Sequence, residues 1–504
     1  MTAAATDGDP GTRGTRSVKS AALWAASSQY SLFALQFVTS VVISRFFLKP
    51  EEIGLFSVAL AAAMVLSIIQ DFGLQRYIGR HPTGDRAMVR SCTAIAITFS
   101  LVLAGVIYAI AHPLSRLYSE PRIEPILRLI AASYIFVPWS IVPMALLARK
   151  LDFRSTFAIN LSGALANSAA ALTLAWLGWS SFALAWGMIA QAVVRAVVAQ
   201  IARPTFPGRG ISGSEIRAIL KFSAGTTPIY LSGGIGVRTP DMIVGGLQGM
   251  TAAGLYSRGA ALAAQLHTLV VGAVSAIYYP TFARLRDEGK ELGPYYERVV
   301  AAHGAIVWPA MALLAVLSEP VILMLYGPGW AQAAPLLAFV AVAECFFVAL
   351  PLHVDLPILL GRMRLLLWFN LADTALSVAT LAAGAAMGVE AAAASRIVYG
   401  LGWFCLYALW LQRLIGFSWT AAVHIYARSA LVALATILPA ILAITLWRTP
   451  STLGFLGLAA TGVTSALAWI GAICLLRHPA REDLAGMAAH VIAPLISRFK
   501  ARAG

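Results

Sequence analysis

Charged side chains are scarce in this sequence. They make up 12% of its 504 residues, whereas 59% are hydrophobic, and the mean hydropathy is +0.78. A soluble globular chain usually carries about 25% charged residues. A chain this apolar has more apolar surface than a water-soluble core could bury, so the composition excludes an ordinary soluble protein and predicts a membrane protein.

Several motifs are also lacking. The chain has four cysteines, and none belongs to a Cys-x-x-Cys pair, so we expect neither a disulfide nor a zinc site. No Walker A motif, dinucleotide fingerprint or cluster of metal ligands occurs. We therefore expect no catalytic residue, no metal and no cofactor, apart from a coupling H⁺ or Na⁺. Residues 1–19 lack the apolar segment of a signal peptide and predict a disordered cytoplasmic tail.

Long apolar stretches are abundant. Crossing a bilayer takes about 20 apolar residues, and only helices or closed barrels satisfy every backbone group there. The ten-residue alternation typical of barrel strands is absent. The predicted fold is therefore an all-α polytopic membrane protein with about fourteen spans. They lie near residues 20–44, 53–74, 91–113, 126–148, 157–177, 180–202, 219–247, 252–276, 299–318, 332–356, 365–388, 391–411, 425–447 and 453–476.

The basic residues alternate between the two sides of this topology. With the N-terminus inside, most arginines and lysines fall in cytoplasmic segments, as the positive-inside rule requires. This distribution accounts for the net charge of +15 without a nucleic-acid partner. It also places both termini in the cytoplasm. The opposite side holds Arg45, Lys49, Arg116, Arg122, Arg128 and Arg448.

A weak internal repeat divides the chain. ISRFFLKPEEIGLFSVALAAAM from Ile43 aligns with IVGGLQGMTAAGLYSRGAALAA from Ile243. Because an even number of spans separates the two copies, both halves have the same orientation, which is typical of transporters with two parallel repeats. Chance similarity between helices rich in alanine, glycine and leucine is the alternative.

The predicted organisation follows from this repeat. Two six-helix lobes are joined by a cytoplasmic linker, two further transmembrane helices follow, and the basic cytoplasmic tail is either an amphipathic surface helix or disordered. These parts span residues 20–202 (first lobe), 203–218 (linker), 219–415 (second lobe), 416–476 (two helices) and 477–504 (tail).

Four arginines lie in the outer halves of predicted spans, namely Arg238, Arg258, Arg396 and Arg45. An arginine at the bilayer centre costs about 2.5–3.5 kcal/mol by insertion scales and usually faces a watery cavity or a partner. Guanidinium groups match phosphate oxygens, so these four are candidates for binding a diphosphate. The alternatives are snorkelling to the outer interface and, for Arg238, a pair with Asp241.

Three acidic residues lie inside spans: Asp241, Glu344 and Asp373. Each is a candidate for binding a coupling H⁺ or Na⁺, and an interhelical hydrogen bond is the alternative role. Pro228 and Pro240 interrupt the glycine-rich span 219–247 and are predicted hinge positions. Close packing through small residues is the alternative there. The histidines show no ligand-like clustering and are interpreted as structural.

Three segments in order, RTPDMIVGGLQGMTAAGLYSRGAALA, IYYPTFARLRDE and LYGPGWAQAAPLLAF, resemble the bacterial Wzx-type polysaccharide flippases. FFLKPEEIGLFSVALAAAM and DFGLQRYI near the N-terminus fit the same family. The superfamily also holds the multidrug and toxin extrusion proteins and the lipid II flippases. The resemblance covers nearly the whole chain.

The resemblance implies two six-helix lobes, two extra helices and residence in the bacterial inner membrane. It implies transport of undecaprenyl-diphosphate-linked oligosaccharide units for exopolysaccharide or lipopolysaccharide synthesis, by alternating access around a cationic cavity. The implied partners are this substrate, membrane lipids, and polymerase and export machinery. A cation-coupled multidrug extruder is the first alternative, disfavoured because the intramembrane charges are mainly basic. A membrane polymerase or ligase is the second, disfavoured by the short external loops.

Overall fold

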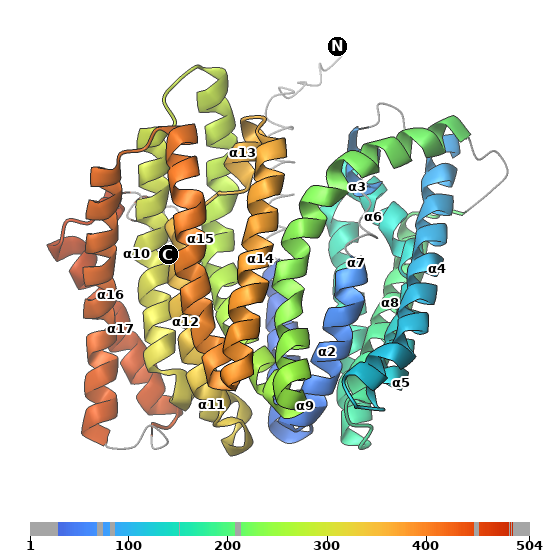
Figure 1. Ribbon diagram of the computed structural model, residues 1–504, viewed down its shortest axis with the longest axis horizontal. Helices are drawn as coiled ribbons and strands as arrows, with labels where there is room; N and C mark the ends of the chain where they lie inside the picture. Colours follow the sequence, from blue (N-terminus) through green and yellow to red (C-terminus); the bar gives the residue numbers. More distant parts are fainter. Residues whose placement is uncertain are drawn as a thin grey trace, which may run out of the picture. The chain divides into compact units, whose positions relative to one another are not determined.

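Figure 1 shows the computed structural model of the chain. The described residues form helices joined by short turns, with no β-strand among them, which confirms the all-α prediction. The tail predicted at 1–19 and most of the tail predicted at 477–504 lie outside the described residues. The structure describes residues 29–67, 74–80, 86–150, 152–206, 213–447, 453–482, 484 and 486.

The chain divides into two compact units, Met1–Met242 and Ile243–Gly504. The first unit holds residues 29–46, α2 (Pro50–Ser67), α3 (Leu74–Arg80), α4 (Arg86–Leu117), α5 (Ile123–Tyr134), α6 (Pro138–Arg149), α7 (Phe153–Trp176), α8 (Phe182–Ala202) and the first part of α9 (Gly213–Asp287). The second holds the rest of α9, α10 (Gly293–Val316), α11 (Ser318–Tyr326), a 3₁₀ turn at Pro328–Trp330, α12 (Ala333–Ala349), α13 (Asp355–Leu359), α14 (Met363–Met387), α15 (Val389–Ile415), α16 (Trp419–Trp447) and α17 (Phe455–Leu475).

The boundary between the units falls inside α9, near the end of the seventh predicted span at residues 219–247. Contacts explain this assignment. Ile219, near the start of α9, is fully buried in a cluster with Ile78 of α3 and Met88 of α4. Further along, the hydroxyl of Tyr118 donates a hydrogen bond of 2.9 Å to the carbonyl oxygen of Met242. The first part of α9 therefore packs with the helices that precede it.

A single glycine separates the two predicted spans within α9. Gly249 has φ 84° and ψ 174°, the one non-helical position in this element. Glycine adopts a positive φ without steric penalty because it has no Cβ. The break lies between the predicted spans 219–247 and 252–276, so an interruption of the helix between them is confirmed.

Each predicted span overlaps a described helix, but the count of fourteen is not confirmed. Among the described residues, nine helices are long and apolar enough to cross a membrane. The count becomes ten when α5 and α6, bent by 45° at their junction, form one span. Pro138 begins α6, and its missing N–H cannot continue the helical ladder of α5. The chain is thus a multi-pass membrane protein.

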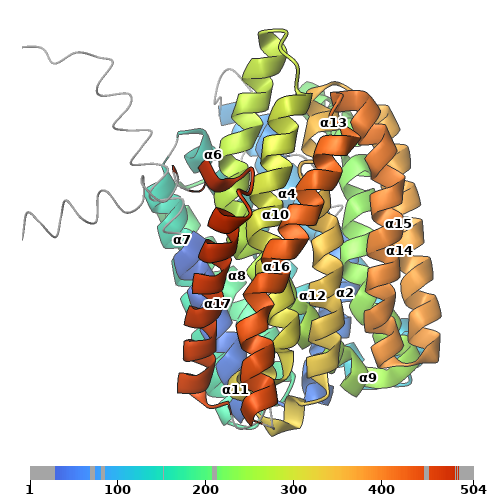
Figure 2. The same cartoon turned by 90° about the vertical axis from the view of Figure 1, so that its left-hand side faces the viewer.

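The last two helices of the chain pack together on the second unit. Figure 2 shows α16 and α17 side by side near α10. The indole nitrogen of Trp469 in α17 donates a hydrogen bond of 2.7 Å to the carbonyl oxygen of Ala305 in α10. Leu431, Leu434 and Leu438 on α16 remain exposed, as expected for a helix that faces lipid. These helices correspond to the two predicted after the second lobe.

The close approach of α14 to α15 predicts a packing-sensitive position. A Cβ added at Gly384 would lie 2.6 Å from the carbonyl oxygen of Ala391 and 2.7 Å from Cβ of Ser395. Gly384→Ala should therefore destabilise the protein by about 1–3 kcal/mol, the usual cost of overpacking. Thermal unfolding in detergent measures this change. Gly105→Ala is the control, because a Cβ at Gly105 meets nothing within 4 Å; equal unfolding midpoints would contradict the prediction.

Candidate functional site

Arg396 of α15 lies on the faces of two aromatic rings. Its Cζ is 5.4 Å from the ring centroid of Phe347 in α12 and 5.2 Å from that of Tyr399, one turn along α15. The side chain is half-buried. Cation–π contacts of this kind contribute about 0.5–2 kcal/mol. They stabilise the charge but use no N–H group, and Arg396 forms no ion pair with any acid in the described part of the chain.

The same aromatic ring connects Arg396 to Asp373. The Tyr399 hydroxyl donates a hydrogen bond of 2.8 Å to Oδ1 of Asp373 in α14. The structure thus brings together two residues predicted separately, a candidate anion ligand and a candidate ion-coupling acid. Asp373 accepts the interhelical hydrogen bond that was its alternative role. We call Phe347, Asp373, Arg396 and Tyr399 the α12–α15 cluster.

Glu344 of α12, the second predicted ion-coupling residue, has a partner that sequence reasoning missed. Its Oε2 contacts Nδ1 of His267 in α9. The carboxylate is largely buried and the imidazole half-buried. The sequence alone did not pair them, because they are far apart in the chain and neither belongs to a recognisable motif. This contact joins α9 to α12 within the second unit.

Of the remaining predicted arginines, Arg258 belongs to the second unit, and Arg45 and Arg238 belong to the first. Arg258 lies half-buried on α9, within the second unit. The neighbouring Gly259 lets this turn of α9 approach α12, because a Cβ there would lie 3.1 Å from the backbone nitrogen of Leu337. Arg45 in the first unit is exposed, with Cζ 5.8 Å from the ring centroid of Phe46.

Arg238 and Asp241 both lie on α9 within the first unit. Arg238 is exposed, and Asp241 is half-buried. The pairing of Arg238 with Asp241 stays a prediction. Pro240 between them is buried, and for Pro228 the structure describes only a position within helical backbone. The hinge role of both prolines stays a prediction.

Sequence reasoning also missed Arg195 of α8. It lies about two turns before the end of α8 at Ala202, roughly 10 Å inside at 1.5 Å per residue. Its position in the apolar run FALAWGMIAQAVVRAVVAQIA was the available signal. An ionisable residue inside a span is a functional candidate in its own right. The search for arginines in the outer halves of spans left it out, because it lies in the half of the span predicted to be cytoplasmic.

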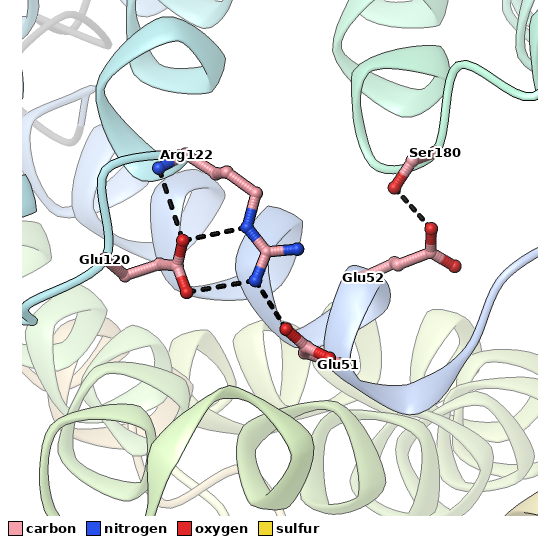
Figure 3. A network of polar contacts seen from close by, with 5 residues as sticks. All are labelled: Glu51, Glu52, Glu120, Arg122 and Ser180. Atoms are coloured by element: carbon pink, nitrogen blue, oxygen red, sulfur yellow. Dashed lines mark hydrogen bonds and ion pairs between the residues drawn. The ribbon is translucent and has the colours of Figure 1, made fainter.

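Arg122 belongs to a network of polar contacts at one end of the first unit (Figure 3). Arg122, after α4, donates from Nε to Glu120 at 2.8 Å and from Nη2 to Glu51 of α2. Beside it, Glu52 accepts hydrogen bonds from Ser180 and from the backbone nitrogen of Lys49. These contacts tie the start of α2 to the α4–α5 and α7–α8 turns. Hydrogen bonds from Arg122 lower the pKa of Glu120, and the bond to Glu120 raises the pKa of Arg122.

The architecture is that of a class of membrane transporters. The lipid II flippase MurJ, in an inward closed conformation, has the same fold, with a TM-score of 0.69 and 12% identity over 90% of this chain and 98% of that one. A multidrug resistance MATE family transporter of the MOP superfamily, in an inward-facing conformation, gives a TM-score of 0.53 with 15% identity over 77% and 96% of the two chains.

Sequence comparison assigns the chain to a protein family, which is a narrower group than the proteins that share its fold. A family model described as polysaccharide biosynthesis protein matches residues 42–335, more than half of the chain. The chain belongs to this family, as the resemblance predicted. It is 25% identical to the succinoglycan biosynthesis transport protein ExoT of Rhizobium meliloti (strain 1021) over 79% of this chain and 78% of that protein. It is 20% identical to the lipopolysaccharide biosynthesis protein WzxC of Escherichia coli (strain K12), over 64% and 66% of the two chains.

The Arg122 network predicts a pH dependence of stability. The lowered pKa of Glu120 means that its stabilising effect is complete above the ordinary carboxyl value of 4.5 and is lost as the pH falls through the lowered value. Arg122→Gln removes the cause of the shift, so the unfolding midpoint of the variant should fall less steeply with acidification below about pH 5 than that of the wild type. Thermal unfolding in detergent across this range tests it.

The matched control is Arg203→Gln. Arg203 is also exposed in the first unit, but it does not contact Glu51 or Glu120 in the described network. The control should keep the wild-type pH profile. A wild-type profile in Arg122→Gln as well would show that the network does not couple protonation to stability.

Proposed function

We propose that this protein is a flippase for undecaprenyl-diphosphate-linked oligosaccharide repeat units in exopolysaccharide or lipopolysaccharide biosynthesis. Membership of the polysaccharide biosynthesis family carries the proposal. The names of both relatives, one a succinoglycan transport protein and the other a lipopolysaccharide biosynthesis protein, support it. The fold shared with the lipid II flippase supports the reaction type, which is transport and not catalysis.

The physical problem of such a flippase is a charged, sugar-bearing head group. The diphosphate and its sugars must cross about 30 Å of hydrocarbon. An arginine inside the bilayer can bind phosphate oxygens with its planar fork of N–H groups. Arg396 suits this role because aromatic faces stabilise its charge while its N–H groups make no ion pair within the described residues. Arg238, Arg258 and Arg45 are further candidates.

Alternating access is the proposed mechanism. Two lobes would expose a cationic cavity to one leaflet and then the other while the polyprenyl chain stays in lipid, with Pro228 and Pro240 as hinges. The cytoplasmic side of the membrane is electrically negative, so a head group that carries negative charge is driven outward by about 2.3 kcal/mol per charge per 100 mV. The membrane potential alone therefore favours the outward direction.

The location and partners form part of the same proposal. The protein would lie in the bacterial inner membrane with both termini in the cytoplasm, as the alternation of basic loops indicates. Its partners would be the lipid-linked substrate and membrane lipids, together with polysaccharide polymerase and export machinery. No nucleic acid is involved.

A cation-coupled multidrug or toxin extruder is the alternative supported by a specific observation, the shared fold with a MATE transporter. Two findings favour the flippase. The fold is more similar to that of the lipid II flippase, and the relatives at the sequence level are named for polysaccharide synthesis. A membrane polymerase or ligase is less favoured still, because both structural relatives are named as a flippase or a transporter.

Arg396→Gln tests both the proposed flippase function and the proposed role of Arg396 in binding the diphosphate. In a bacterium that lacks its own flippase for the same repeat unit, the wild type should restore surface polysaccharide. The variant should restore it about tenfold or more slowly, because a charge-assisted hydrogen bond contributes roughly 1.5–3 kcal/mol. Arg396→Lys keeps the charge but not the fork and should be intermediate.

Arg413→Gln is the matched control for this experiment. Arg413 lies in the last turn of the same helix and is exposed, so its loss should leave transport unchanged. No restoration by wild-type protein present at normal levels would contradict the flippase proposal. Wild-type activity of Arg396→Gln would contradict only the role of Arg396.

We further propose that Glu344 and His267 hold the coupling proton, if transport is ion-coupled, with Asp373 and Asp241 as other candidates. In proteoliposomes, Glu344→Gln should abolish the acceleration of flipping by a pH gradient while flipping driven by membrane potential persists. Glu319→Gln, an exposed acid in the first turn of α11, is the control. A pH response retained in Glu344→Gln would exclude this residue as the proton site.

A further inference from the structure

Arg195 is held deep in α8 by a neighbouring glycine. A Cβ at Gly163 of α7 would lie 2.2 Å from Cγ and 2.8 Å from Cδ of Arg195. The methylene chain of the arginine therefore crosses the backbone of α7 where no side chain stands. This contact positions the guanidinium between α6, α7 and α8, helices that also share a small buried cluster of Leu147, Ile159 and Ala199.

The guanidinium of Arg195 lacks an adequate partner. Its Nη2 is 3.2 Å from the sulfur of Met144 in α6, and a thioether is a weak acceptor. Its Nε is buried and has no hydrogen-bond partner among the described residues. Leaving a buried charged donor unsatisfied is costly, and an anion placed at this position would relieve that cost.

The surroundings are basic and nearly free of competing acids. The ends of α6, α7 and α8 nearest to Arg195 carry Arg149, Lys150, Arg154 and Arg203. Between residues 149 and 206 the sequence holds one acid, Asp152. That carboxylate is occupied as the N-cap of α7, accepting from the backbone nitrogen of Ser155 at 3.1 Å and from its hydroxyl at 2.7 Å. Basic residues therefore outnumber acids in this stretch of the sequence.

We propose that Arg195, with Lys150 and Arg154, binds the phosphate of an anionic phospholipid between α6, α7 and α8. Arg195 lies roughly 10 Å inside the helix end, so a lipid could place its phosphate near the guanidinium by sinking slightly or by local thinning of the bilayer, as intramembrane arginines induce. Basic sites between transmembrane helices bind anionic lipid head groups in this way. The site belongs to the first unit alone, and it does not depend on the proposed transport function.

The experiment measures lipid binding by the full-length protein in a zwitterionic detergent. Phosphatidylglycerol should raise the unfolding midpoint of the wild type more than phosphatidylcholine does, because only the former carries net negative charge. Arg195→Met, which keeps an unbranched apolar side chain in the groove over Gly163, should weaken phosphatidylglycerol binding about tenfold or more. Arg195→Lys should keep part of it.

Arg413→Gln removes one exposed arginine from the second unit and should bind phosphatidylglycerol as the wild type does. If Arg195→Met does not fold, Lys150→Gln/Arg154→Gln replaces it, since both side chains are exposed, and this variant should also bind more weakly. Wild-type phosphatidylglycerol affinity in the folded variant would overturn the proposal.

A further titration tests whether the bound phosphate belongs to a phospholipid or to the proposed transport substrate. Undecaprenyl diphosphate is titrated against the same proteins. If Arg195→Met loses the response to undecaprenyl diphosphate but keeps the response to phosphatidylglycerol, the site belongs to the transport substrate and the proposal is wrong. Loss of the phosphatidylglycerol response alone supports a site for a resident phospholipid.

Discussion

The cost of burying charge in a low-dielectric bilayer is the constraint on which this structure depends. The chain contains few charged residues, so each one inside a span needs a specific accommodation. The structure shows three solutions. Arg396 lies on aromatic faces, Glu344 contacts a histidine, and Arg195 lies over a glycine, with the sulfur of Met144 as its polar contact among the described residues. These three environments differ in how many hydrogen-bonding groups of the charged side chain they use.

At one end of the first unit, an arginine is accommodated differently, by ion pairs with carboxylates. There Arg122 is shared between two carboxylates and is about half exposed. Water screens such pairs, so they contribute little stability individually. These pairs position the helices, because one guanidinium joins the start of α2 to the turn that follows α4. The charges at this end of the first unit therefore connect helices.

The sequence predicted the fold class and most helices because the requirement for apolar residues is imposed on every span. It predicted a break between the spans 219–247 and 252–276, and the structure places that break at Gly249. The bend at Pro138 was missed, since apolar composition alone does not distinguish one straight helix from two short ones. The packing of the first part of α9 against the first unit depends on tertiary contacts such as that of Tyr118 with Met242, which no local pattern encodes.

The site was less predictable than the fold. Arg396 and Asp373 could be selected individually as charges inside spans, but the tyrosine that joins them to one cluster could not, since it is one of 15 tyrosines in the chain. His267 was judged structural because pairing with Glu344 requires α9 and α12 to meet, which no local pattern encodes. Arg195 had a visible signal in the apolar run around it, but it lies in the half of its span predicted to be cytoplasmic and so was not among the arginines of the outer halves.

The glycine contact between α14 and α15 has a consequence for motion. Gly384 brings the two helices to backbone contact near Ala391, and the Tyr399–Asp373 hydrogen bond joins them again further along. Two attachments at different heights oppose sliding of one helix along the other. Arg396 on α15 and Asp373 on α14 therefore keep their spacing when these two helices move as a pair.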